Sequence, residues 1–263
     1  MSMETTAPQL EQNPYVKELL DILKTHDPKQ LVYLKDMIAN TVKIEQQLAA
    51  AVVELAVMRQ ELAVIRDESH PMRTFLKNAI TYIQDNIQLL SERLEALKKS
   101  IIEGCKNALD SIKERGISAL NGIAKYFKVK PALEEIVRVS SQAVKDNDKS
   151  INRIEGISKE YHLAGKHIKN IGRALIGKEP ISSIKPVGKI AKTFEAPYKA
   201  VRVCNLSIRS AAQNALNNLT RLQKIADHPK PMKEQVETAA KQAAKHNARN
   251  APDKAMNASA IEL

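Results

Sequence analysis

A seven-residue repeat of apolar side chains is the feature that most constrains the fold of this chain. Two rows of residues with this spacing cover residues 34–65: Leu34, Thr41, Leu48, Leu55 and Leu62, with Met37, Ile44, Ala51, Met58 and Ile65. Such rows predict a long helix with coiled-coil-like packing. Asp27, Pro28 and Gln30 have the order of an N-cap, a first-turn proline and a capping-box partner, and Pro71 follows the expected end near Glu68.

The repeat returns after Pro71. Its rows are Ile80, Ile87, Leu94 and Ile101, with Ile83, Leu90 and Leu97; they shift by four residues at Cys105, and Gly116 marks the end. The two helices have similar lengths and a short link that contains a proline. They therefore predict an antiparallel hairpin.

A third long helix is predicted from Pro131 to about Ile176. Its rows are more polar: Val137, Val144, Ile151, Ser158, Gly165 and Gly172, with Leu133, Ser140, Asn147, Ile154, Tyr161, Ile168 and Leu175. The glycines and prolines of residues 177–186 predict a loop. A short helix through Phe194 and a last helix that begins or kinks at Pro197 are expected to follow.

Composition agrees with an all-α fold. Eight Gly, three Phe, six Tyr and no Trp are few for the turns and strands of sheet-containing folds. We predict an elongated bundle of long antiparallel helices with coiled-coil-like heptad packing. Its expected parts are a short N-terminal helix (1–26), a helical hairpin (27–130), a basic helical segment (131–228) and a polar, disordered tail (229–263).

The N-terminus lacks a secretory signal, and no window of about 18 residues is apolar and uncharged, so no transmembrane segment is predicted. We therefore expect a cytoplasmic protein. Its two cysteines, Cys105 and Cys204, lie in helical patterns and are expected to be reduced and to pack as small apolar residues.

Charge is distributed unevenly along the chain. Residues 1–70 carry seven Lys or Arg and eleven Asp or Glu, whereas residues 150–227 carry fourteen and five, a net charge of +9 within a chain total of +11. Candidate residues for binding a polyanion are basic and belong to the third long helix, the loop and the next helix: Arg138, Lys145, Lys159, His162, Lys166, Lys169, Arg173, Lys178, Lys185, Lys189, Lys192, Lys199 and Arg202.

Five of these cations repeat in one heptad row from Arg138 to Arg173, which predicts a cationic helix face. Such a face suits the phosphate backbone of DNA or RNA, without sequence specificity because aromatic residues are not interleaved. Two other interpretations stay open. The row is a solvated helix face, or the acidic N-terminal third neutralises it within the fold or between subunits.

No motif indicates catalysis, a metal or a cofactor, and no small-molecule substrate is expected. Residues 172–179 match most of a phosphate loop, but Glu179 replaces the Ser or Thr that would hold magnesium. Gly177 also has the position of a helix C-terminal stop. His162 and His167 are five residues apart and do not share a helix face.

Several stretches resemble an uncharacterised all-helical family of gut Firmicutes that is often encoded on integrative and conjugative elements. They are Asn13–Val16, Glu103–Ala108, Glu155–Leu175 and Gly177–Pro180. The resemblance implies a mobile-element setting and assigns no residue a role.

Three hypotheses follow. The first is a non-enzymatic accessory protein that binds a polyanion. The second is a protein-interaction module, either an oligomeric scaffold or an inhibitor of a host factor, that acts through coiled-coil surfaces. The third is a membrane-surface helix, disfavoured because the face at Ser158, Gly165 and Gly172 is weakly apolar.

Overall fold

The computed structural model describes residues 9–64, 71–181 and 189–227, and within these ranges it contains helices and loops but no strand. The elements follow one another along the chain as α1 (Gln9–Gln12), α2 (Pro14–His26), α3 (Pro28–Val64), α4 (Pro71–Arg115), the 3₁₀ helix η1 (Ile117–Tyr126), α5 (Lys130–Leu175) and α6 (Lys189–Asp227). The prediction of an all-α fold is confirmed. The predicted tail (229–263), the link before Pro71 and residues 182–186 of the predicted 177–186 loop lie outside the described residues.

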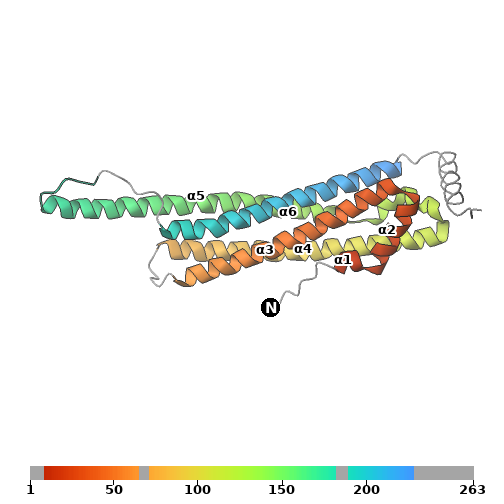
Figure 1. The fold of residues 1–263 in the computed structure, drawn as a ribbon, viewed down its shortest axis with the longest axis horizontal. Coiled ribbons are helices and arrows are strands. Elements are labelled where there is room, and N and C mark those ends of the chain that lie inside the picture. Colours follow the sequence, from red (N-terminus) through yellow and green to blue (C-terminus); the bar gives the residue numbers. More distant parts are fainter. Residues whose placement is uncertain (1–8, 65–70, 182–188, 228–263) are drawn as a thin grey trace, which may run out of the picture.

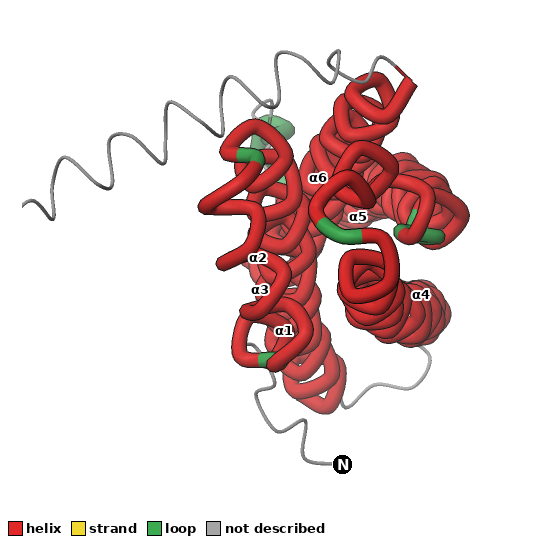
Figure 2. Tube along the Cα trace, turned by 90° about the vertical axis from the view of Figure 1, so that its right-hand side faces the viewer, coloured by secondary structure: helices red, strands yellow, loops and turns green. Residues whose placement is uncertain are grey.

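Four long helices form the body of the molecule. Helix α3 packs against α4 and α6, and α5 packs against the same two helices. Successive long helices run in opposite directions along the long axis (Figure 1), and the end-on view shows them around a common interior (Figure 2). Helices α1 and α2 lie against this body at the end where η1 joins α4 to α5.

The heptad rows read from the sequence form this interior. In α3 every row member from Leu34 to Met58 is at most 4 % exposed, and the rows of α4 from Ile80 to Ile101 are also buried. Thr41 is the polar member of the α3 rows, and its hydroxyl donates to the carbonyl of Met37 at 2.9 Å. A long core of this kind holds the helices side by side along their length.

Local signals fix the helix ends. Asn13 accepts a hydrogen bond from the amide of Tyr15, and Asp27 accepts bonds from both the backbone and the side chain of Gln30. The Gln30 amide also donates to the carbonyl of Leu120 in η1 at 3.0 Å. Gly116 ends α4 with φ of 70°, a conformation that favours glycine.

The last helix differs from the prediction. The structure has one continuous helix from Lys189 to Asp227 with Pro197 inside it, so the separate short helix ending at Phe194 is wrong. A proline inside a helix removes one backbone donor and favours a kink. Here Pro197 and Tyr198 are both buried, and Tyr198 is fully covered, so packing against the bundle offsets the lost hydrogen bond.

Candidate functional site

Helix α5 continues beyond the helices that cover it. Ser158 is the last buried residue among its described side chains, and the C-terminal part of α5 projects past the ends of α3, α4 and α6 (Figure 1). We call residues 159–175 the overhang. At 1.5 Å per residue it is about 25 Å long.

The tip of the overhang is a well-formed chain reversal. Gly177 has φ of 69°, its amide donates to the carbonyl of Ala174, and the amide of Lys178 donates to the carbonyl of Arg173 at 2.9 Å. These two bonds make a Schellman motif, the common glycine-dependent end of a helix. The phosphate-loop-like pattern is therefore a helix C-terminus, whose dipole disfavours phosphate.

The chain after the tip turns back along α5. The side chain of Asn170 makes two hydrogen bonds with the backbone of Ile181, and the guanidinium of Arg173 donates to the carbonyl of Glu179 at 2.6 Å. We call residues 178–181 the return segment. These contacts hold it against the overhang, so the tip presents its charges from an ordered backbone.

The outer part of the overhang carries cations and no acid. Residues 161–178 include Lys166, Lys169, Arg173 and Lys178 but no Asp or Glu. At 100° per residue, Lys159, Lys166 and Arg173 lie within about 40° of one another around the helix, and Lys169 lies beside them. We call these four residues the cationic face. Lys159, Lys169 and Lys178 are exposed, whereas Lys166 and Arg173 are half-buried.

Within the bundle, several of the predicted polyanion-binding residues have acidic partners. Arg138 makes two hydrogen bonds to Glu135, Lys199 is 3.1 Å from Glu195, and Arg202 bonds Asp148. The bond from Arg138 lowers the pKa of Glu135 and raises that of Arg138. The acidic partners recorded for these three cations lie outside residues 1–70, so the acidic N-terminal third does not supply them.

The structure therefore divides the predicted residues into groups. Lys145 is exposed on the bundle, and the overhang with its return segment carries five: Lys159, Lys166, Lys169, Arg173 and Lys178. Lys185 lies outside the described residues. So do the side chains of His162, Lys189 and Lys192, although their backbones are helical.

The row from Arg138 to Arg173 also does not form one straight face. On a straight α-helix, positions spaced by seven turn by about 20° per heptad, so five heptads displace Arg173 by about 100° from Arg138. The bundle part and the overhang therefore present their cations in different directions unless α5 supercoils.

Sequence reasoning missed an exposed apolar surface on the overhang. Ile168 is 70 % exposed, Ile171 63 % and Leu175 82 %, and exposed Ala164 precedes them at the same spacing. These four residues, which we call the apolar row, lie within about 60° of the helix circumference and opposite the cationic face. The signal was available in their 4-3-4 spacing and in the length of α5, which exceeds what α4 and α6 cover.

An open groove of about 630 Å³ runs between α4 and α5 at the base of the overhang. Arg153 lies over the Phe75 ring at 5.2 Å, and Ile157 lines the same groove. Tyr82 donates a short hydrogen bond to Asp146 across it. Burial alone would raise the pKa of Asp146, but the bonds from Tyr82, Gln142 and Lys149 outweigh it and lower that pKa.

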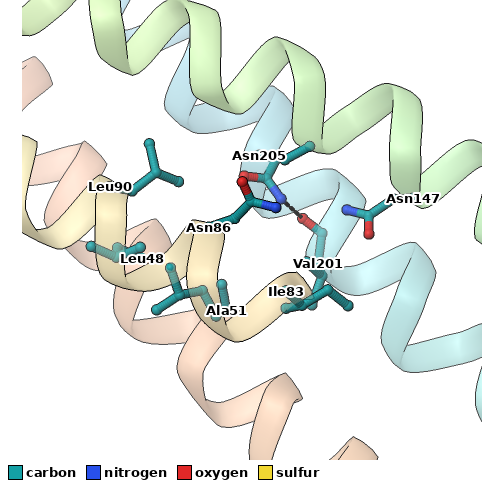
Figure 3. Close-up of a pocket in the computed structure, with 10 residues that line it drawn as sticks. Leu48, Ala51, Ile83, Asn86, Leu90, Asn147, Val201 and Asn205 are labelled. Carbon is teal, nitrogen blue, oxygen red and sulfur yellow. Dashed lines mark hydrogen bonds between the residues drawn. The ribbon is translucent and has the colours of Figure 1, made fainter. Parts of the chain in front are cut away.

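The enclosed cavity in the core is too small for a ligand. Asn86, Asn147 and Asn205 come from three helices and meet apolar side chains around a volume of about 10 Å³ (Figure 3). This is about the space of one water molecule. Asn205 donates to the carbonyl of Val201, whereas no described residue accepts a hydrogen bond from the amide of Asn147.

The remaining reactive groups do not form a site. Cys105 and Cys204 are both buried thiols without a disulfide, and burial raises the pKa of Cys105 to about 12. A thiol with such a pKa stays protonated at neutral pH and is a poor nucleophile. Within the described ranges, no three His, Cys, Asp or Glu side chains gather as metal ligands.

None of the helices in the described part of the chain combines the length and the apolar character needed to cross a bilayer.

Comparison with known proteins identifies a family. No curated protein and no solved structure matches the chain significantly. The model of a protein family described as a family of unknown function (DUF6674) matches residues 12–260, which include every described helix except the first residues of α1. The chain therefore belongs to this family of unknown function.

Proposed function

We propose that this protein is a non-enzymatic binding protein that holds the backbone of a nucleic acid, DNA or RNA, through the cationic face of the overhang. The observation that carries the proposal is the acid-free run of residues 161–178 on a helix that stands clear of the bundle. Lys159, Lys169 and Lys178 are exposed there. Cations on a projecting rod can approach a polyanion without a clash with the bundle.

The pairing of cations elsewhere supports this assignment. Arg138, Lys199 and Arg202 already interact with carboxylates, so a phosphate would have to compete for them. Exposed ion pairs contribute only about 0–1 kcal/mol, but each acid also repels a polyanion. The overhang carries one acid, Glu160, near its base, and residues 161–175 carry none, so we place the contact there. The resemblance to a protein family that is often encoded on integrative and conjugative elements suits an accessory role in DNA transfer or protection.

A salt titration tests the proposal. Binding to fluorescent duplexes of two unrelated sequences is measured by anisotropy at increasing salt. If all five cations of the overhang and return segment meet phosphates, the logarithm of the affinity falls with a slope of about −4.5 against the logarithm of salt concentration. Both sequences should bind equally, because backbone contacts carry no base information. No binding at low salt to either duplex or to single-stranded RNA would remove the proposal.

A further inference from the structure

We propose that the apolar row is the interface with a second copy of this chain, and that two overhangs pair antiparallel. The inference is independent of the proposed function, because it concerns the opposite face of the same helix. Its starting point is that three large aliphatic side chains, Ile168, Ile171 and Leu175, are each more than 60 % exposed on one helix face. An apolar row at heptad spacing is the seam by which helices pair.

The apolar row continues a face of α5 that is already an interface. At 100° per residue, Arg153 has the angular position of Ile171, and Ile157 has that of Leu175. These two residues line the groove between α5 and α4. Helix α4 begins at Pro71, so it covers this face of α5 only up to the groove. Beyond that point the same face carries Ala164, Ile168, Ile171 and Leu175 without cover from α4. A helix that lay along the overhang in line with α4 would therefore cover the apolar row.

In an antiparallel pair with its two-fold axis near position 166, each apolar row is covered by the apolar row of the second copy. Leu175 then lies opposite Ile157 of the second copy, at the groove beside Phe75. Ile168 lies opposite Ala164, so a large side chain meets a small one. Such an arrangement is isologous, which is the usual geometry of homodimers.

The charges favour a second copy over a lipid surface. In the antiparallel pair, Lys159, Lys166 and Arg173 point away from the seam on both copies, so the repulsion between them is weakened by distance and by salt. A lipid surface under the apolar row would leave those cations on the far side of the helix from its headgroups.

The pair is expected to be weak and concentration-dependent. A seam of about 27 Å between single helices belongs to the small interfaces of transient complexes. We expect sedimentation equilibrium of the full chain, without nucleic acid, to give a monomer–dimer equilibrium with Kd on the order of 10–100 μM. Ile171→Glu should weaken dimerisation at least about tenfold, because the charge would be buried in the seam. Val203→Glu, at an equally exposed site on α6, should leave it unchanged.

Cysteine cross-linking tests the register. An oxidised mixture of Ala164→Cys and Ile168→Cys proteins should form a disulfide dimer faster than either variant alone, and the buried native cysteines give no background. A monomer at all concentrations, or a dimer that Ile171→Glu does not weaken, would overturn the inference. So would co-sedimentation of the monomer with phosphatidylserine-containing vesicles that Ile171→Glu abolishes, because it would assign the apolar row to a membrane.

Discussion

The fully buried hydroxyl of Tyr198 lowers the stability of the folded protein, and a single substitution removes it. Tyr198 is 0 % exposed, burial raises its pKa, and no described residue pairs with its hydroxyl. We expect Tyr198→Phe to raise the free energy of unfolding by about 1 kcal/mol in urea denaturation, because an unpaired buried donor is removed. Tyr126→Phe is the matched control. Its hydroxyl bonds Ser111 at 2.6 Å, so this variant should lose about 1 kcal/mol. Destabilisation by Tyr198→Phe would contradict the assignment.

The Tyr82–Asp146 bond predicts a pH dependence. The folded-state pKa of Asp146 is lowered, so its contribution to stability is present above its unfolded pKa and is lost as pH falls through the folded value. Tyr82→Phe should cost about 1 kcal/mol near neutral pH, a modest value because Tyr82 is 40 % exposed. The difference between the two proteins should shrink as the pH falls below the ordinary pKa of an aspartate, about 3.9, because protonation of Asp146 removes the charged acceptor. If Tyr82→Phe lowers the free energy of unfolding equally at neutral and at acid pH, the bond to the charged Asp146 is not the cause of the loss.

Two glycines in helices make opposite predictions at the scale of elements. A Cβ at Gly104 would lie 2.6 Å from the Phe127 ring, whereas a Cβ at Gly156 would have open space around it. Gly104→Ala should therefore cost about 1–3 kcal/mol by forcing apart α4 and the segment after η1. Gly156→Ala should stabilise by about 0.5–1 kcal/mol through its better helix propensity. Thermal unfolding followed by circular dichroism measures both, and equal shifts would contradict the packing described here.

The elements also show what a sequence reveals and what it leaves open. The rows of α3 and α4 were predictable because their residues from Leu34 to Met58 and from Ile80 to Ile101 are buried by neighbouring helices. Ile154 and Ile168 stand in one row of α5, yet Ile154 is fully buried and Ile168 is 70 % exposed. Their spacing is the same, and only the ends of α4 and α6 decide which is covered. The prediction of a separate helix before Pro197 was wrong for a related reason. Tertiary packing, and not local propensity, decides whether a helix continues through a proline.

At the scale of the whole molecule, the predicted cations could be found from sequence but their surroundings could not. Arg138 and Arg173 belong to one heptad row, but one faces Glu135 and the other stands on the overhang. Ion pairs between helices, such as Arg202 with Asp148, depend on which helices are neighbours. The overhang itself is a difference between helix lengths, which becomes visible only when the chain is folded.

We propose that the overhang, and not the bundle, contacts the nucleic acid. The most direct test of this proposal compares two variants with equal loss of charge in the same salt titration: Lys159→Gln/Lys169→Gln/Lys178→Gln on the overhang and return segment, and Arg138→Gln/Lys145→Gln/Lys199→Gln on the bundle. The overhang variant should bind more weakly with a slope reduced from about −4.5 to about −1.8, while the bundle variant keeps the slope of the unmodified protein. Equal losses in both variants, or a larger loss in the bundle variant, would contradict the account.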